Sequence, residues 1–448
     1  MIVWHNMLNK IKNNSLVVVF ILFSVSFLHG LGYKKIQLQN GMEAYIIKTN
    51  NPIVTHVVTY GVGSMEENSS QEGLAHLLEH VMFLGSNRYS KDKLSSVLKN
   101  AGASYNAYTS NDLTLYYFTF PKESLEQFIK IEADRMQWLT IDNAIVDNEK
   151  SVVNKERDMY NNKPYSVFYA LVNQTLYPTT NYGRSVIGYP STFNNLNGSD
   201  VRKFYEKWYN PNNAKVFIIG DINVDIAYEL INKNYGKINN RTNDYNRVNY
   251  IEVPYQANIT VDFKEQRINQ DIIMKSYLVP SVISDSSVEN QDSYSLILLA
   301  NMLSSHSGRL YKSLVLDKKL ALDIVVNYDP YTKGNTSFSI VVVPNQGLDK
   351  ELVFMEAEKE LTRILASGFT SSEVKHSAKK IRDQMEYLKE LDSEYLFSLA
   401  RYVNAGLTVE QFNNLGDNLY SVSSNTVNKV AKDLLSKYFV IAKASKTK

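Results

Sequence analysis

The sequence predicts an α+β fold of two homologous domains, in which each domain packs helices against a β-sheet. Three observations support this prediction: strand-like and helix-like segments alternate, a turn signal joins the first two strands, and the order of segments repeats in the second half. With 448 residues, the chain has room for two to four domains of roughly 100–200 residues each. The repeat is too long for a solenoid, so we expect two copies of one large unit.

The first 32 residues have the pattern of an export signal. Lys10 and Lys12 give a positive start, and an apolar run of fourteen residues follows from Ser15 to Leu28. Fourteen helical residues span about 21 Å, which is short of the roughly 30 Å core of a bilayer. We therefore expect a signal peptide over residues 1–32, cleaved near Gly30 or Gly32, and the alternative is an uncleaved anchor. The mature protein would be periplasmic or secreted, without a stable membrane span.

Composition excludes several classes of protein. Hydrophobic residues make up 44% and charged residues 21%, which excludes a disordered chain, a collagen-like fibre and a multi-span membrane protein. The chain has no cysteine, which excludes a disulfide scaffold, a cysteine protease and a cysteine-ligated metal site. A net charge of +2 argues against a dedicated nucleic-acid binder, so we expect no nucleic-acid partner.

The first half of the mature chain opens with a hairpin signal. Two apolar segments flank Asn40-Gly41, which is the strongest short-range turn pair. From their apolar, β-branched and aromatic content, strands are expected over residues 36–38, 44–47, 52–62, 103–108, 113–121 and 216–221. From their apolar spacing, helices are expected over residues 72–84, 123–139 and 145–160.

The second half repeats this order. Thr336–Pro344 resembles Thr114–Pro121, and each segment is followed by a polar break and a long helix. Helices expected over 350–365 and 372–388 take the places of the two long helices of the first half. The Asn-rich stretch 239–249 has no apolar period and predicts a linker. We therefore expect a signal peptide and three further parts: an N-terminal domain at 33–238, a linker at 239–250 and a C-terminal domain at 251–448.

The segment His76-Leu-Leu-Glu79-His80 carries the chemistry. In a helix, these three polar side chains share one face. Two imidazoles one turn apart can hold one zinc ion at about 2.0–2.1 Å, and the carboxylate between them can take a proton from water. This is the inverted zinc motif H-x-x-E-H.

A zinc hydrolase needs a third protein ligand and one open position. Glu149 and Glu156 lie seven residues apart, and hence on one face of the helix expected over 145–160. One could bind the metal while the other holds a ligand histidine by a hydrogen bond. The spacing does not choose between them, and such a pair is more often a solvated helix face.

Several spaced motifs resemble the M16 metallopeptidases, the family of pitrilysin, insulinase and mitochondrial processing peptidase. They are the segments Gly73–Gly85 and Ala103–Tyr116, the pair Glu149 and Glu156, and the segments Tyr182–Gly188 and Tyr209–Asp221. The resemblance runs from about Leu38 to the C-terminus. It implies two homologous domains, each with a mainly antiparallel sheet.

The resemblance also implies roles for the motif residues. His76, His80 and Glu156 would be the ligands of one Zn²⁺ per chain. Glu79 would be the general base, and Glu149 would support the site from behind.

The resemblance also implies a role for a segment that follows the motif. Asn106, Ala107, Tyr108 and Thr109 would form an edge strand that a peptide substrate extends as an added strand. Asn106 could hold a substrate carbonyl group. The alternative is an ordinary strand with a polar face.

The second half departs from the family pattern. Active members usually carry an arginine and, seven residues later, a tyrosine that help to hold substrate. The segment Ser304–Asp323 aligns with that region, but Leu316 stands at the arginine position and Asp323 at the tyrosine position. Arg309 lies nearby at a place that is structural in the family. We expect a related partner subunit to supply the missing pair, and the alternative is a self-sufficient enzyme with an altered substrate clamp.

Together these features predict an exported zinc metalloendopeptidase. It would hydrolyse peptides or small unfolded polypeptides through zinc-activated water, as the catalytic subunit of a heterodimer. One alternative is a non-catalytic scaffold of the same fold, which the complete set His76, Glu79, His80 and Glu156 disfavours. The other is an unrelated binding protein with an accidental motif, which the additional spaced motifs disfavour.

Overall fold

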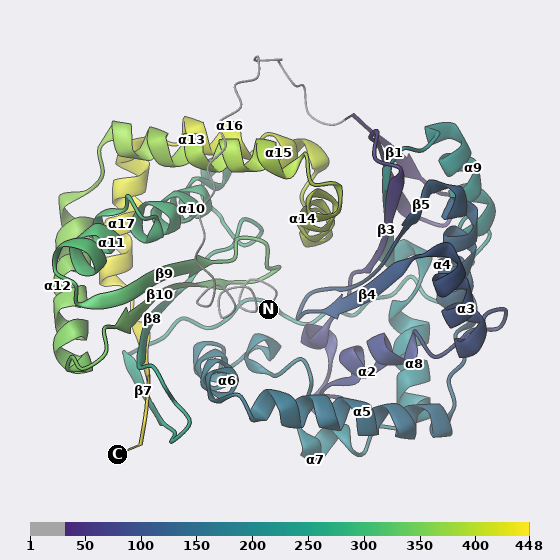
Figure 1. Ribbon diagram of the computed structural model, residues 1–448, viewed down its shortest axis with the longest axis horizontal. Helices are drawn as coiled ribbons and strands as arrows, with labels where there is room; N and C mark the ends of the chain where they lie inside the picture. The colour runs from purple at the N-terminus through teal and green to yellow at the C-terminus, as the bar shows by residue number, and fades with distance from the viewer. Residues whose placement is uncertain (1–31, 448) are drawn as a thin grey trace. The chain divides into compact units, whose positions relative to one another are not determined.

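Two β-sheets, one in each half of the chain, organise the computed structural model, which describes residues 32–447 (Figure 1). Each sheet is packed with helices, so the predicted α+β class is confirmed. Apart from Gly32, the signal peptide predicted for residues 1–32 lies outside the described residues. Between residues 32 and 447, no helix is long and apolar enough to cross a membrane.

The first sheet has six strands in the order β1-β2-β6-β3-β5-β4. The strands are β1 Tyr33–Gln37, β2 Glu43–Lys48, β3 Ile53–Tyr60, β4 Ser104–Thr109, β5 Thr114–Pro121 and β6 Ala214–Gly220. β2 and β6 are parallel, and all other neighbours are antiparallel. The hairpin predicted at Asn40-Gly41 joins β1 to β2. Among the described strands, β4 pairs with β5 alone, so it forms one edge of the sheet.

The first half has its own set of helices. They are α2 Leu74–Val81, α3 Lys91–Ala101, α4 Leu125–Trp138, α5 Asn143–Asn161, α6 Pro164–Leu176, α7 Pro190–Phe193, α8 Gly198–Trp208 and α9 Val224–Asn234. Of these helices, α2, α4 and α9 contact the first sheet. α2, α4 and α5 are the three helices that the apolar spacing predicts. α4 and α9 lie together along the sheet, and Phe128 of α4 stacks on Phe120 of β5 with ring centroids 4.2 Å apart (Figure 1).

The second sheet has five strands in the order β7-β11-β8-β10-β9. The strands are β7 Ile259–Lys264, β8 Ile272–Val279, β9 Ala321–Tyr328, β10 Thr336–Pro344 and β11 Phe439–Ser445. β7 and β11 are parallel and the other neighbours are antiparallel, which is the pattern of β2-β6-β3-β5-β4. Only β1 has no counterpart among the described strands. The predicted repeat is therefore confirmed by the topology of the two sheets.

The second half has its own set of helices. They are α10 Gln291–Ser304, α11 Arg309–Tyr311, α12 Lys350–Ser367, α13 Ser371–Leu388, α14 Asp392–Ala405, α15 Val409–Asn413, α16 Leu415–Ser421 and α17 Ser424–Ser436. Shorter turns of helix connect the elements: η2 Ser64–Glu66, η3 Lys122–Ser124, η4 Asn181–Gly183, η5 Pro211–Asn213, η6 Val288–Asn290 and η7 Lys312–Asp317.

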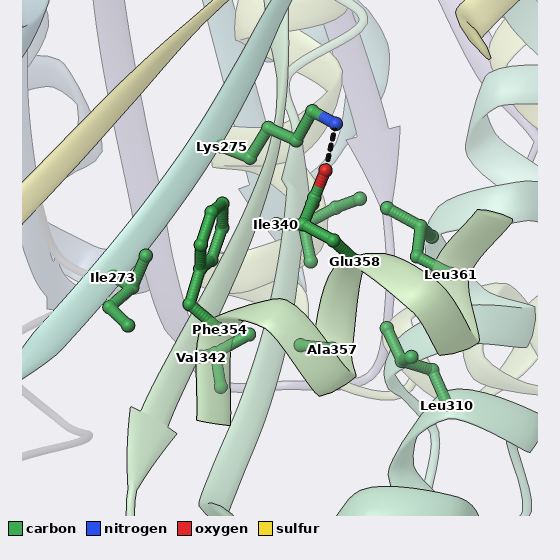
Figure 2. Close-up of a pocket in the computed structure, with 9 residues that line it drawn as sticks. All are labelled: Ile273, Lys275, Leu310, Ile340, Val342, Phe354, Ala357, Glu358 and Leu361. Atoms are coloured by element: carbon green, nitrogen blue, oxygen red, sulfur yellow. Dashed lines mark hydrogen bonds and ion pairs between the residues drawn. The ribbon is translucent and has the colours of Figure 1, made fainter. Parts of the chain in front are cut away.

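α12 packs on one face of β8 and β10, as Figure 2 shows. Phe354 and Leu361 of α12 lie against apolar side chains of the sheet, around a cavity of about 10 Å³, the size of one water molecule. Lys275 of β8 enters this layer and forms an ion pair with Glu358. No predicted site residue lines this cavity.

Each half also contributes one helix to the sheet of the other half. α6 belongs to the first half, but its buried side chains Phe168 and Val172 pack with residues of β8, β10 and β11. α14 of the second half packs on β3 and β6, where Ser393 and Thr55 share a hydrogen bond of 2.8 Å. The exchange joins the two halves.

The segment predicted as a linker is irregular and is attached to the first half. Residues 238–258 contain no helix or strand. Arg241 donates to the carbonyl of Tyr209, and Arg247 donates to the carbonyl of Gly61. The domain boundaries at 238 and 251 stay a prediction.

Candidate metal centre

Helix α2 places the H-x-x-E-H motif on one face. Its start requires glycine at position 73, because φ is +89° and a Cβ atom would lie 2.8 Å from the carbonyl oxygen of Ile187. Leu74, Leu77, Leu78 and Val81 are buried in the core. The polar face carries Glu79 and the two histidines toward β4 and α5.

Buried polar groups hold both ends of α2. At the N-terminus, the carboxylate of Glu67 accepts hydrogen bonds from the amides of Gly73 (2.8 Å) and Ala75 (2.7 Å). At the C-terminus, the guanidinium of Arg135 donates to the carbonyl of Met82 (3.3 Å) and pairs with Glu132. An acid at the start of a helix and a base at its end complement the helix dipole. Hydrogen bonds therefore hold both ends of the helix that carries the motif.

His76, His80 and Glu156 meet at one point. Oε2 of Glu156 lies 3.4 Å from Nε2 of His80 and 3.8 Å from Nε2 of His76. One candidate ligand atom from each residue lies within 4.8 Å of the other two. Ligand atoms placed about 2.0–2.1 Å from a tetrahedral zinc ion are roughly 3.4 Å apart. The three side chains therefore have the donor types and the spacing that zinc requires.

Glu149 lies behind His80. Its Oε1 is 2.8 Å from Nδ1 of His80, which leaves Nε2 of the ring directed at Glu156. Such a carboxylate fixes the orientation of a ligand imidazole. The structure thus separates the two glutamates that the spacing left equivalent: Glu156 faces the point where the histidines meet, and Glu149 faces away from it.

The surroundings change the pKa of both histidines. Burial, together with the nearby ring of His80, lowers the pKa of His76 to about 4. Burial also acts to lower the pKa of His80, but the bonds to Glu149 and Glu156 outweigh it and raise that pKa to about 9. The neutral form of His76 is the form that a metal ion binds.

Glu79 lies between this cluster and β4. The hydroxyl of Thr109 donates a short hydrogen bond to its carboxylate, and the backbone amide of Thr109 also faces it. Burial raises the pKa of Glu79 to about 7, and the bond from Thr109 opposes this shift. A carboxyl group with a pKa near 7 can both accept and return a proton.

The predicted strand Asn106–Thr109 lies in β4, at the edge of the sheet. The amide of Ala107 donates to the side-chain oxygen of Asn106 (2.9 Å) instead of to β5, so it points to the open edge. Thr109 has the same orientation, since two residues along a strand face the same side. Tyr108 lies half-buried between them. The edge position is confirmed, while peptide binding there stays a prediction.

The positions that the sequence aligns with the family's arginine and tyrosine lie in two elements of the second half. Leu316 lies in η7 and is 53% exposed, and Asp323 lies in β9, where its carboxylate accepts from the amide of Ile324 (2.8 Å). Arg309 forms an ion pair with Glu373 at 2.6 Å. It therefore links α11 to the start of α13 and is not available to a substrate.

Comparison with known families identifies the fold. The family model described as insulinase (peptidase family M16) matches residues 44–189, and the model described as the peptidase M16 inactive domain matches residues 195–381. The chain belongs to peptidase family M16. The resemblance stated from the motifs is thus confirmed.

M16 relatives of similar length support this assignment. Zinc protease PqqE of Helicobacter pylori is 23% identical over 365 residues, which cover 81% of this chain and 80% of PqqE. The solved structure of a protease from H. pylori has a TM-score of 0.84 at 21% identity and covers 93% of this chain and 100% of that one. The first half of the periplasmic protease PqqL from Escherichia coli has a TM-score of 0.78 at 20% identity, with 92% and 91% covered. The chain therefore has the fold of the M16 metallopeptidases.

Sequence reasoning missed the residues that support the M16 site from outside the motif. Glu67 and Arg135 are each 1% exposed, and charged residues are rarely buried without a partner. A usable signal existed for Arg135, since it and Glu132 are three residues apart and hence neighbours on one face of the helix. The contact of Asp112 with Lys333 had no sequence signal, because 221 positions separate the two residues.

Proposed function

We propose that the protein is a zinc-dependent endopeptidase with His76, His80 and Glu156 as the ligands of one Zn²⁺. The observation that carries this proposal is the convergence of two Nε2 atoms on Oε2 of Glu156, at 3.4 and 3.8 Å, beside the half-buried Glu79. When bound, zinc lowers the pKa of a ligated water toward about 7 and polarises the carbonyl group of the scissile bond. The names of the M16 relatives, which include zinc proteases, support the same activity.

The remaining chemistry belongs to residues of this chain. Glu79 takes a proton from the attacking water and returns it to the nitrogen of the leaving amine. The hydroxyl of Thr109 orients the carboxylate of Glu79 for this transfer. Glu149 keeps the ring of His80 in place through the contact at Nδ1. The reaction needs no covalent intermediate.

Peptides bind along β4 in this proposal. The side chain of Asn106 holds the amide of Ala107 at the open edge, at the place where a carbonyl group of an added strand would bond. A peptide that replaces this bond frees Asn106 to hold a substrate carbonyl group. Backbone pairing gives affinity with little sequence preference, so unfolded polypeptides are the expected substrates. Because Thr109 ends β4 and bonds to Glu79, a peptide paired along β4 would pass beside Glu79.

The protein acts in the periplasm as the catalytic subunit of a heterodimer. The apolar run Ser15–Leu28 supports export, and the relative PqqL is described as periplasmic. Leu316 and Asp323 cannot supply the arginine and tyrosine of the family pattern, and Arg309 is paired with Glu373. A related chain that carries the pair would complete the substrate clamp.

The first test is peptide cleavage by purified protein from Tyr33 onward, compared with Glu79→Gln. We expect zinc in both proteins, because Glu79 moves the proton but does not bind the metal. Any cleavage of a quenched fluorescent peptide by the wild type should be absent from Glu79→Gln. Glu229→Gln, which changes an exposed glutamate of α9, is the matched control and should cleave normally. Protein without zinc would refute the metal site. Zinc without cleavage would refute a self-sufficient enzyme, and cleavage would then depend on the partner chain.

A further inference from the structure

The loop between β9 and β10 is held firmly in the second half. Arg401 of α14 forms an ion pair of 2.9 Å with Asp329 at the start of the loop. The ring of Tyr331 packs against Tyr402 with centroids 5.0 Å apart, and the amide of Val282 donates to the carbonyl of Pro330 (2.9 Å). The tip of the loop, Tyr331–Asn335, therefore has a defined position.

This tip contacts the first half at the turn that follows β4. The amide of Lys333 donates to Oδ2 of Asp112 (3.1 Å), and its ammonium group donates to the carbonyl of Asp112 (3.3 Å). Tyr182 donates its hydroxyl to Oδ1 of Asp112 (2.8 Å) and accepts from the amide of Gly334 (3.0 Å). The four residues form a closed ring of hydrogen bonds across the two halves.

Most of the ring is buried and Lys333 is half-buried, so each member depends on the others. Asp112 is only 9% exposed, and burial raises its pKa. Burial, together with the charge of Arg247, lowers the pKa of Lys333 to about 8, while Asp112 and Glu66 oppose this shift. Removal of one charged partner leaves the other buried and unpaired, which is strongly unfavourable.

Gly334 permits the close approach of the two halves. A Cβ atom at this position would lie 1.9 Å from the carbonyl oxygen of Tyr250 and 2.9 Å from the ring of Tyr182. Any larger residue must displace the loop from the first half. This position therefore offers a way to move the loop without removing a charge.

The turn that receives the loop is continuous with the catalytic end of β4. Ser110 bonds to Leu113 through its amide (2.9 Å), and Ser64 donates to the carbonyl of Ser110 (3.1 Å). Thr109, which bonds to Glu79, directly precedes Ser110. One short turn therefore connects Asp112 to the open edge of β4 and to the residue that bonds to Glu79.

We propose that the tip Tyr331–Asn335 is a positioning element for the substrate strand, with Lys333 as its positioning residue. The second half holds no metal-ligand cluster among its described residues, but through this loop it sets the edge to which the peptide adds. The inference rests on the proposed peptidase function. Lys333 itself touches no substrate.

The experiment uses the full chain with three substitutions. Lys333→Met removes the ammonium group, Gly334→Ala displaces the loop, and Lys318→Met is the control, since Lys318 pairs with Glu356 away from the first half. We expect hydrogen–deuterium exchange of residues 104–112 to become about tenfold faster in the first two variants, and unchanged in the control. Unchanged exchange in 104–112, or equal acceleration over both sheets, would refute a positioning role.

A kinetic measurement separates this inference from the proposed function. For a long peptide, Lys333→Met should raise KM about tenfold with little change in kcat and with normal zinc content, because it disturbs binding and not proton transfer. Lys333→Arg should restore part of the affinity. Equal loss of kcat and zinc would show a merely structural role. If the wild type cleaves nothing, the proposed function fails, while the exchange measurement still decides the role of the loop.

Discussion

The two halves of the molecule can be compared position by position through their sheets. Thr114 begins β5 opposite Tyr60, and Thr336 begins β10 opposite Val279. Apart from β1, the two sheets have the same strand order in this register, and each receives a helix from the other half. Nevertheless, only the first half brings together metal-ligand side chains among the described residues. The fold alone therefore does not specify the chemistry.

One helix–helix contact, between α2 and α5 in the first half and between α10 and α13 in the second, shows how small the chemical difference between the two halves is. In the first half, His80 of α2 meets Glu149 of α5, seven residues after the N-cap Asp142. In the second half, Asn301 of α10 accepts a hydrogen bond of 3.0 Å from Ser377 of α13, seven residues after the N-cap Thr370. The helix pair is kept, and short neutral groups replace the imidazole and the carboxylate. The candidate metal site thus differs from the equivalent place in the second half by a few side chains on one scaffold.

Installing the second-half pair in the first half should have the largest effect. His80→Asn together with Glu149→Ser removes one ligand and its support, and retains a pair that can bond across the two helices. We expect loss of zinc and a fall in peptide cleavage of at least about 10³-fold, because the metal site supplies the reaction chemistry. Metal analysis, peptide cleavage and circular dichroism check this expectation.

The single variant Glu149→Ser is the matched control for this exchange. It keeps all three ligands, and loss of such a supporting carboxylate lowers metal affinity by about 10–100-fold. It should therefore bind zinc weakly instead of not at all. If the double variant His80→Asn with Glu149→Ser keeps one zinc ion per chain, this pair does not account for the difference between the two halves.

The exchanged helices predict an effect on stability that crosses the two halves. Phe168 of α6 is fully buried against the second sheet. Phe168→Ala should lower the free energy of unfolding by about 3–5 kcal/mol through the lost burial and the cavity. Hydrogen exchange should accelerate in β8 and β11, although the substituted residue belongs to the first half. Acceleration confined to the first sheet would contradict the packing of α6 on the second sheet. Val152→Ala, on the exposed face of α5, is the control and should change the free energy of unfolding little.

The sequence predicts local features of this fold well and distant ones poorly. The strands and long helices follow from residue patterns over a few turns, and the face shared by His76 and His80 is a property of any helix. The choice of Glu156 over Glu149 depends on how α5 lies beside α2, which no local pattern contains. The apolar face of α6 predicts that the helix is buried, but not that it is buried against β11. For the same reason, no local pattern predicts that the loop at Lys333 contacts the first half.

The smallest predicted effect concerns one buried position that differs between the sheets. The strand register places His56 of β3 at the position of Lys275 in β8. Burial, aided by the charge of Arg135, lowers the pKa of His56 from 6.5 to about 3, whereas Lys275 is paired with Glu358. Because the unfolded chain takes up a proton below pH 6.5 and the folded chain does not, His56 makes the folded state less stable as the pH falls from about 6.5 toward 3.

A pair of histidine variants measures this contribution. The free energy of unfolding of the wild type should fall with decreasing pH more steeply than that of His56→Gln, by up to about 1.4 kcal/mol per pH unit below pH 6.5. Denaturant unfolding at several pH values between 5 and 8 gives both slopes. His376→Gln, at an exposed histidine of α13, should keep the wild-type slope. If His56→Gln also has the wild-type slope, the folded chain accommodates a charged imidazole at this position. Both sheets would then accept a cation at the equivalent buried position.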